Sequence, residues 1–350
     1  MTMPIYENAI YRAQLERVAQ HMTCAESLRG KRVLLTGATG LIGAALVDLL
    51  SYLDQSRNLG AVVIAAVRHL ERAKVRFGGR VKYLKYDATQ QFEFDDPVDV
   101  IVHAASAASP DLYVSKPVET LMANVNGLNE LLKFAVGRHV GKVVYVSSSE
   151  VYGRAAPRKN GFVETDSGFV EILNPRSSYP MGKRAAETLA ACYVKQYGLN
   201  VSIVRPGHIY GPTATNSDIR VSSAFAYQAA RGERIVMKSA GSQERSYTHC
   251  LDCASAILAV AVDGESGRAY NIANSDVRCS IRRMAEILAA AGGVELAVEA
   301  PSAEEQKAFN PMDNSCLDAS ALMALGWHGV ISAEEGLRDT VRILKEHSNA

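Results

Sequence analysis

Three side chains of this 350-residue chain have the types and the spacing to move a proton together with a hydride. Tyr179 and Lys183 are four residues apart, so on a helix they share one face. A nearby ammonium group lowers the pKa of a phenol, which at its usual value of ~10 is a poor base. We therefore expect Tyr179 to exchange a proton with a substrate oxygen while hydride leaves or joins the adjacent carbon. Ser148 is expected to bind the same oxygen and hold it in line.

A glycine-rich turn near the start of the chain predicts a dinucleotide site. It follows a short apolar stretch over 31–36 and precedes an apolar helix predicted over 41–53. Gly37 permits the tight turn, Gly40 lets the backbone approach a pyrophosphate, and Gly43 lets the helix pack closely on the strand. The free N–H groups at the start of that helix favour a bound anion.

The rest of the first half alternates between short apolar strands and helices. Strands are predicted over 61–67, 81–86, 98–103, 142–146 and 201–205, with helices over 117–136 and 180–197. Pro180 is expected to be the first residue of the second helix, where its missing N–H costs little. The pattern predicts an α/β fold of the Rossmann type, a doubly wound parallel sheet with helices on both faces.

Ligands of such sheets bind beyond the carboxyl ends of the strands, and this rule predicts the cofactor site. The residues expected to bind the cofactor follow these ends or lie in the glycine turn and on the catalytic helix: Gly37, Thr39, Gly40, Leu41, Ile42, Gly43, Arg68, Asp87, Ala88, Ala104, Ala105, Ser106, Tyr179, Lys183, Pro206 and His208.

The pattern also predicts how the chain is divided. Residues 1–30 are expected to form a helical extension that packs on the body or on a partner subunit. Residues 31–211 form the predicted cofactor-binding domain. Residues 212–350, with longer polar stretches and a β-like run over 269–273, are predicted to form a smaller substrate lobe, partly interleaved with the first domain.

Composition narrows the function class. A net charge of +1 argues against a nucleic-acid partner, and the absence of an apolar run of membrane-spanning length argues against a membrane partner. Of six cysteines, only those at 250 and 253 form a C-x-x-C pair, which supplies two of the four ligands that zinc needs. We expect no metal site, buried thiols and a cytoplasmic protein.

Together these features resemble the extended short-chain dehydrogenase/reductases, the NAD-dependent epimerase/dehydratase group that modifies nucleotide sugars. The resemblance covers about residues 30–345. It includes the runs 36–43, 100–105, 147–153, 179–183, 205–212, 245–248, 325–327 and 335–337. It implies a tightly held NAD, a nucleotide-diphosphate sugar, taken to be UDP-linked, and oxidation of the sugar at C4 to a 4-keto intermediate. It also implies a homodimer, and the apolar helices 117–136 and 180–197 are expected to meet the second subunit.

Within this group the nearest resemblance is to UDP-glucuronate decarboxylases. It rests on the runs 148–153, 175–179 and 218–221. The likeness implies that Ser148 belongs to the catalytic triad and that Ser149 and Glu150 act at the C5–C6 end of the sugar. The residues that it assigns to substrate are Ser148, Arg220, Val221 and Arg245.

The same residues are also compatible with other functions. A UDP-sugar 4-epimerase needs only Ser148, Tyr179 and Lys183, with room for the keto sugar to turn over. A 4,6-dehydratase is disfavoured, because Ser149 stands where that chemistry uses an aspartic acid. A non-catalytic nucleotide sensor on the same fold has no need of the Tyr–Lys pair.

The end of the second strand bears on the choice of cofactor. Arg68 stands where NAD-binding members have an acidic residue for the adenosine ribose. A cation there also accommodates the 2′-phosphate of NADP, which leaves an NADPH-dependent keto-sugar reductase as a further alternative. NAD is the expected cofactor.

Overall fold

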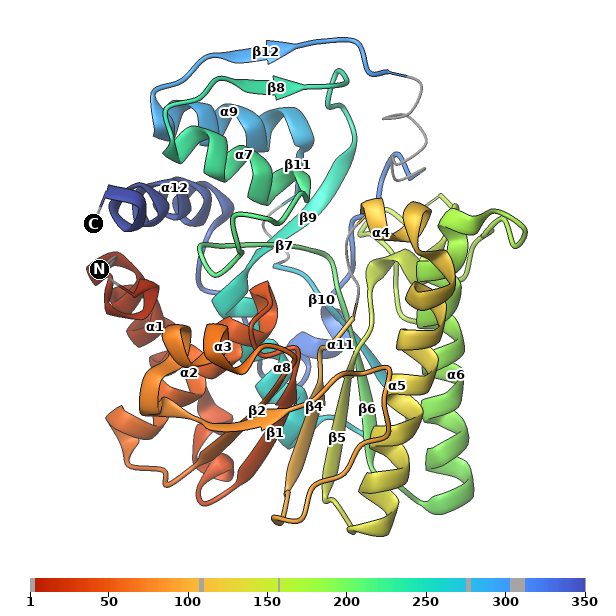
Figure 1. Cartoon of the computed structure of the whole chain (residues 1–350). Coiled ribbons are helices and arrows are strands. Elements are labelled where there is room, and N and C mark those ends of the chain that lie inside the picture. Colours follow the sequence, from red (N-terminus) through yellow and green to blue (C-terminus); the bar gives the residue numbers. More distant parts are fainter. Residues whose placement is uncertain (1–3, 107–109, 157, 275–277, 303–311, 350) are drawn as a thin grey trace.

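A seven-stranded sheet, parallel in every strand pair, forms the centre of the chain (Figure 1). The computed structural model describes residues 4–106, 110–156, 158–274, 278–302 and 312–349. The strand order is β10-β6-β5-β4-β1-β2-β3. These strands are β1 (Arg32–Thr36), β2 (Val62–Val67), β3 (Lys82–Lys85), β4 (Val100–His103), β5 (Lys142–Val146), β6 (Val201–Pro206) and β10 (Ala269–Ile272). The predicted doubly wound α/β fold is confirmed.

Both faces of the sheet are covered by apolar helices. On one face α5 and α6 pack side by side over the sheet, through residues such as Leu131 and Ala186. On the other face α2 and α8 pack together, through residues such as Leu46 and Ile257. Among the described residues the α-helices are α1 (Ala9–His21), α2 (Leu41–Arg57), α3 (Leu70–Phe77), α4 (Pro110–Ser115), α5 (Pro117–Gly137), α6 (Ser178–Tyr197), α7 (Val221–Ala230), α8 (Cys250–Asp263), α9 (Ile281–Gly292), α11 (Ser320–Met323) and α12 (Ala333–Asn349).

A second layered region lies above the carboxyl end of the sheet in Figure 1. Helices α7, α9 and α12 pack together there around Phe225, Leu288 and Val341. Its short strands pair as β11-β9-β7 and β12-β8. They are β7 (His208–Tyr210), β8 (Ile235–Met237), β9 (Glu244–His249), β11 (Arg278–Ser280) and β12 (Leu296–Val298). This arrangement leaves the strand ends of the main sheet facing the upper region.

The sequence pattern misplaced one strand and one helix boundary. The run around Ala269–Ile272, expected in the smaller lobe, is the edge strand β10 and pairs in parallel with β6. The chain reaches that edge because α8, which follows β9, packs on one face of the sheet and leads back to β10. Helix α6 begins at Ser178, so Pro180 is not its first residue. Pro180 still lies in the first turn, where its missing N–H breaks no intrahelical hydrogen bond.

The N-terminal segment packs on the body of the same chain. Helix α1 joins the core with α2 and α8, and Tyr11 and Leu15 are fully buried there. Gln14 donates to Asp339 of α12 at 3.2 Å, and Arg17 pairs with Glu335 at 2.9 Å. The extension therefore connects the helices on one face of the sheet, α2 and α8, with the last helix, α12.

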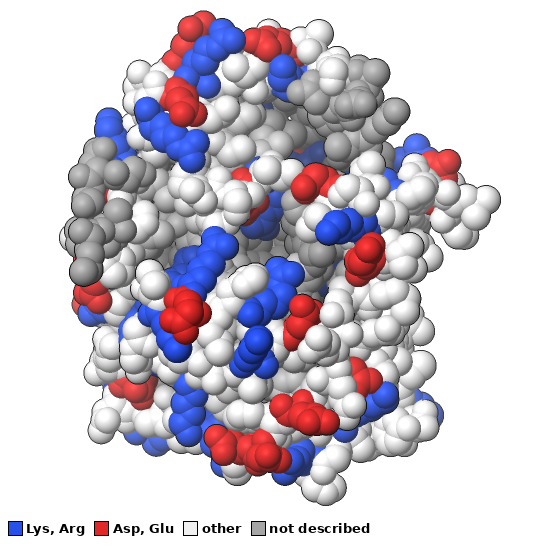
Figure 2. Space-filling model, in the orientation of Figure 1, with Lys and Arg blue, Asp and Glu red and all other residues white. Residues whose placement is uncertain are grey.

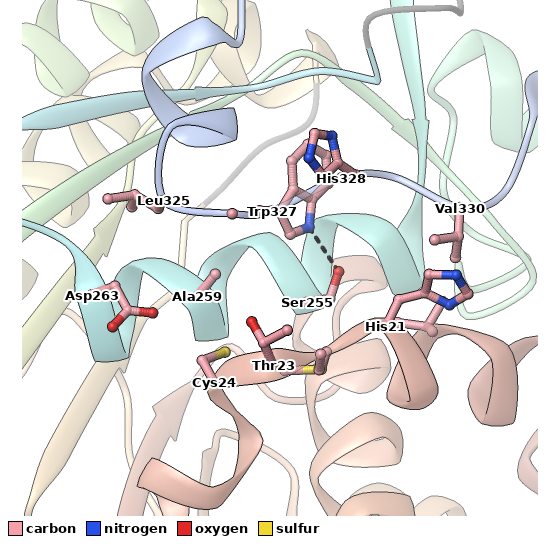
Figure 3. A pocket seen from close by; sticks show the side chains of 13 residues that line it. His21, Thr23, Cys24, Ser255, Ala259, Asp263, Leu325, Trp327, His328 and Val330 are labelled. Carbon is pink, nitrogen blue, oxygen red and sulfur yellow. Dashed lines mark hydrogen bonds between the residues drawn. The ribbon is translucent and has the colours of Figure 1, made fainter.

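A small cavity lies where this extension meets α8 and the segment 325–330 (Figure 3). The Trp327 indole closes it and donates to the Ser255 hydroxyl at 2.9 Å. Its lining includes His21, Cys24 and Asp263, but none of the residues expected to act in catalysis. We regard it as a packing feature of the extension.

A buried ion pair contributes to holding the extension in place. The Asp48 side chain is 4% exposed, and its Oδ1 accepts from Arg80 at 2.8 Å. The Arg80 guanidinium lies 3.8 Å from the centre of the Tyr6 ring, and Tyr11 donates to Asp48 at 3.2 Å. These contacts connect the N-terminal residues to α2 and to the turn after α3.

We expect Arg80→Met to lower the free energy of unfolding by about 3 kcal/mol, because it leaves the Asp48 carboxylate buried without its cation. Urea denaturation measures this loss. Lys74→Met is the control, since its pair with Glu71 is exposed and should not matter measurably. A loss at Arg80 no larger than at Lys74 would show that the buried pair does not stabilise the fold.

Candidate active site

The three predicted catalytic residues meet at the carboxyl end of β5. Ser148 is the second residue after β5, and its hydroxyl accepts from the Glu150 N–H at 3.2 Å. Tyr179 and Lys183 lie one turn apart on α6, and both are buried, at 6% and 2% exposure. The Ser148 side chain acts on the Tyr179 phenol and lowers its pKa, against the larger effect of burial. The structure therefore brings together the groups that the sequence had placed thirty residues apart.

Lys183 points beneath the tyrosine into the sheet. Its Nζ donates to the Val146 carbonyl at 2.8 Å and lies 5.8 Å from the centre of the Tyr179 ring. Burial lowers the pKa of Lys183 to about 7, and the Glu187 carboxylate acts in the opposite direction. The lysine is thus poised to hold or release its proton near neutrality.

The structure corrects the expected direction of the tyrosine shift. Burial raises the pKa of Tyr179 to about 12, and the Glu150 carboxylate adds to the rise. Hydrogen bonds from Ser148 and Tyr113 and the charge of Arg220 act the other way. Loss of solvation outweighs the cations because the Lys183 ammonium group is bound to a main-chain carbonyl instead of the phenol. In this structure Tyr179 is therefore a neutral acid.

Two residues beside Tyr179 were missed by the sequence analysis. The ring of Tyr113, from α4, stacks on the ring of Tyr179 with centroids 4.4 Å apart and planes 11° apart. The Arg176 guanidinium lies 5.6 Å from the centre of the Tyr113 ring. Tyr113 carries no recognisable motif. Arg176 stands in the run before the catalytic helix, and this position was the only available signal.

Glu150 is fixed by that arginine. Arg176 Nη1 donates to Glu150 Oε2 at 2.7 Å and Nη2 donates to Oε1 at 3.3 Å, and both side chains are largely buried. A two-point pair of this kind holds the carboxylate in one orientation. Ser149, next to it, is 5% exposed and begins the short 3-10 helix that ends at Tyr152. Both residues directly follow Ser148, and their action at the C5–C6 end of a sugar stays a prediction.

The glycine turn has the shape of a dinucleotide cradle. Gly37 has a φ of +70°, and a Cβ there would lie 2.8 Å from the main chain of Ala104 and Ala105. A Cβ on Gly43 would lie 2.2 Å from the Gly37 carbonyl oxygen. Gly40 caps α2 without any side-chain bond, which leaves the first N–H groups of the helix available. These residues fit a bound pyrophosphate.

The remaining cofactor candidates line the same edge of the sheet. The Asp87 carboxylate accepts from Thr89, which lowers its pKa, and Arg68 and His69 act in the same direction. His208 Nδ1 is buried without a partner among the described residues, and burial lowers the pKa of this imidazole to about 3. The others lie at these strand ends or in the turn: Thr39, Leu41, Ile42, Ala88, Ala104, Ala105, Ser106 and Pro206.

The two arginines expected to bind substrate differ in their surroundings. Arg220, just before Val221 and α7, forms an ion pair with Asp218, and its charge reaches Tyr179. Arg245 is 3% exposed and donates to the main-chain carbonyls of Met312, at 2.7 Å, and Asp313. Arg245 therefore fixes the 312–313 segment. Figure 2 shows Lys and Arg side chains gathered around the hollow between the lower and upper parts of this face.

Other chemistries find little support in the described part of the chain. No group of three or more potential metal ligands occurs there, and no helix is long and apolar enough to cross a bilayer. Cys250 and Cys253 are buried in α8, and burial raises the pKa of both thiols. They are structural thiols, as the sequence predicted.

Comparison with known proteins identifies the family. The model of the NAD dependent epimerase/dehydratase family matches residues 33–273. UDP-glucuronic acid decarboxylase 6 of Arabidopsis thaliana is 34% identical over 249 residues, which are 69% of each chain. UDP-glucuronic acid decarboxylase 1 of Xenopus tropicalis is 29% identical over 90% of this chain and 72% of its own. The NAD complex of Thermus thermophilus UDP-glucose 4-epimerase is 25% identical, with a TM-score of 0.75 over 90% of this chain and 99% of its own.

The fold, the glycine cradle and the Ser–Tyr–Lys group define an enzyme that uses a nicotinamide dinucleotide. The chain belongs to the NAD dependent epimerase/dehydratase family. The family's description names NAD, and the Thermus thermophilus neighbour is an NAD complex.

The burial of Lys183 makes a testable prediction about stability. Its pKa is about 7 in the folded chain against the usual 10.5, so between these values the unfolded chain binds more protons. Stability from this group therefore rises with pH across the window from 7 to 10.5 and falls as pH drops through it. We expect the unfolding free energy of wild type, minus that of Lys183→Met, to increase with pH in this window.

Urea denaturation at several pH values measures that difference. Lys195→Met, at an exposed position on the same helix, is the control and should give a difference that does not change with pH. A pH-independent difference at Lys183 would mean that its ammonium group is not destabilised by burial.

Proposed function

We propose that this enzyme is a UDP-glucuronate decarboxylase that works through oxidation of the sugar at C4. The observation that carries the proposal is the Glu150–Arg176 ion pair directly beside the Ser148–Tyr179–Lys183 group. The similarity to several curated UDP-glucuronic acid decarboxylases supports it. The UDP-linked sugar as substrate is part of the proposal.

The chemistry follows from the positions of these groups. Tyr179 is neutral in this structure, so it must first lose its phenol proton to solvent. As the phenolate it accepts the proton of the C4 hydroxyl, while Ser148 holds that oxygen. The glycine turn of Gly37, Gly40 and Gly43 would hold NAD, which would supply an acceptor for the C4 hydride and a donor for the later reduction. The resulting 4-keto uronate is a β-keto acid, so the C5–C6 bond breaks, carbon dioxide leaves and the electron pair passes to the C4 oxygen. A proton then adds at C5.

The ion pair suits a negatively charged sugar. A bare Glu150 carboxylate would repel the uronate carboxylate, whereas Arg176 neutralises it at 2.7 Å. Arg176 also lies against Tyr113, so its positive charge is held next to the stacked tyrosines. We propose that this pair receives the C5–C6 end of the substrate.

The neighbouring position disfavours dehydration. Ser149 is a hydroxyl where ejection of water from C6 calls for a carboxylic acid. A serine hydroxyl is a far weaker proton donor, so the site lacks the acid for that step. Epimerisation at C4 needs no group beyond the triad, and the experiment below separates it from decarboxylation.

The test is incubation of the purified protein with UDP-glucuronate and NAD, followed by mass spectrometry and proton NMR of the sugar nucleotide. We expect loss of carbon dioxide and a pentose product. Tyr179→Phe, which keeps the ring and its stacking, should lower turnover by at least about 100-fold, because the proton acceptor is gone. Tyr197→Phe, exposed at the end of the same helix, is the matched control and should turn over normally.

Two results would overturn the assignment. An unchanged mass with inverted C4 stereochemistry would make the protein an epimerase. Normal turnover by Tyr179→Phe would remove the tyrosine from its role whatever the product.

We propose that the protein is a homodimer through α5 and α6. Val118 and Met122 lie one turn apart on α5 and are 69% and 46% exposed. Apolar side chains exposed on one helix face are typical of a covered surface. We expect light scattering to give the mass of a dimer at micromolar concentration and that of a monomer for Val118→Asp/Met122→Asp. A wild-type monomer would contradict the proposal.

The roles of the two domains and the cellular compartment remain predictions from the sequence. In this proposal residues 31–211 bind the cofactor, residues 212–350 bind most of the sugar nucleotide, and the protein resides in the cytoplasm.

A further inference from the structure

A charged pair lies behind the catalytic residues and touches none of them through a hydrogen bond. Glu187 is one turn after Lys183 on α6, and Arg205 lies on β6. Arg205 donates through Nε at 3.0 Å and through Nη2 at 2.6 Å to the two carboxylate oxygens of Glu187. Both side chains are largely buried, at 13% and 12% exposure. This geometry is the two-point pairing that fixes both partners.

The carboxylate reaches the residue just before the catalytic serine. Ser147 donates through its hydroxyl to Glu187 Oε1 at 2.5 Å, and its N–H donates to the Val204 carbonyl at 2.8 Å. Ser147 is 4% exposed. Side chain and main chain of Ser147 are thus both held, one by the helix and one by the neighbouring strand.

The guanidinium reaches the other end of the same loop. Arg205 Nη1 donates to the Tyr152 hydroxyl at 3.1 Å and to the Glu164 carbonyl at 2.7 Å. Tyr152 is fully buried, and its hydroxyl donates to Asn271 on β10 at 2.5 Å. Its position is therefore determined by Arg205 on one side and by the edge strand on the other.

Ser147 and Tyr152 bracket the segment that contains Ser148, Ser149 and Glu150. One ion pair consequently anchors both ends of the loop that carries the proposed chemistry. Small misplacements of such groups cost a large part of the rate, because reacting atoms must be aligned within a fraction of an ångström.

We propose that Glu187 and Arg205 are positioning residues that clamp the loop from Ser147 to Tyr152, so that Ser148 and Glu150 face the sugar correctly. The functional part of this inference rests on the proposed function, while the clamping itself does not. Glu187 has a second effect, since its charge favours the protonated form of Lys183 and so supports a higher pKa against burial.

The clamp is open to small solutes on its outer side. Glu187 and Arg205 line a surface depression of about 510 Å³, together with Glu164, Arg268 and Ala269. Added guanidinium can therefore reach the space that truncation of Arg205 leaves. Arg268 lines the same depression, pairs with exposed Glu265 and serves as the matched control position.

The first experiment needs no substrate. Hydrogen–deuterium exchange by mass spectrometry is measured on wild type, Arg205→Ala, Glu187→Gln and Arg268→Ala. We expect faster exchange over 148–152 in the first two variants, unchanged exchange in β1 and β4, and wild-type exchange in Arg268→Ala. Wild-type exchange over 148–152 in both clamp variants would overturn the clamp, even if the sugar substrate proved to be wrong.

The second experiment uses the turnover of UDP-glucuronate. We expect kcat to fall by roughly 10- to 100-fold in Arg205→Ala and Glu187→Gln, with KM and NAD affinity nearly unchanged, because neither residue touches a ligand. Guanidinium should restore part of kcat in Arg205→Ala. The alkaline limb of the kcat profile should move to lower pH in Glu187→Gln, since Lys183 then loses its proton more readily.

Normal kcat in stably folded variants, or lower thermal stability without a change in kcat, would reduce the pair to a packing role and overturn the inference. No turnover by wild type would remove the proposed function instead, and the exchange result would still decide the clamp.

Discussion

The hydrogen bond from Lys183 to the Val146 carbonyl is the interaction on which the site depends. It joins the helix that carries the tyrosine to the last residue of the strand that carries the serine. Burying a lysine ammonium group destabilises the folded chain. The Val146 carbonyl, which accepts a hydrogen bond, and the Glu187 carboxylate one turn away offset part of this effect. The separation of helix and strand is thereby set at the point where the proton must move.

Burial then sets the resting charge of the site, with opposite effects on the two partners. It favours the neutral phenol at Tyr179 and the neutral amine at Lys183. The charges that act on the stacked Tyr113 and Tyr179 rings are those of Glu150, Arg176 and Arg220. Charge around the phenol, more than the Tyr–Lys spacing alone, decides when Tyr179 can act as a base.

The sequence was sufficient for the architecture because periodicity and glycine spacing are local signals. Six of the seven strands of the main sheet and the cradle at Gly37–Gly43 follow from them. The proximity of Ser148, Tyr179 and Lys183 could be predicted because Ser148 follows a strand end and the other two are four apart on a helix. β10 was assigned to the wrong region because it is distant in sequence from its partner β6, and its local sequence does not show which sheet it joins.

Contacts between segments distant in sequence could not be predicted either, because the sequence signals used are local. Tyr113 meets Tyr179, and Arg205 meets Glu187, Tyr152 and Glu164, only once the sheet is assembled. No spacing of residues in the sequence predicts such contacts. The predicted direction of the Tyr179 pKa shift was wrong, because a sequence does not show that the nearby lysine is turned toward a carbonyl.

The most direct test of the account follows the hydrogen at C4 of the sugar. UDP-glucuronate carrying deuterium at C4 is mixed with the protein and NAD, and the absorbance of reduced nicotinamide and the label in the product are both recorded. The account predicts a transient reduction that deuterium slows, and a pentose product that keeps the deuterium at C4. A product formed with no transient and no isotope effect, or with the label lost to solvent, would contradict oxidation at C4 as the central step.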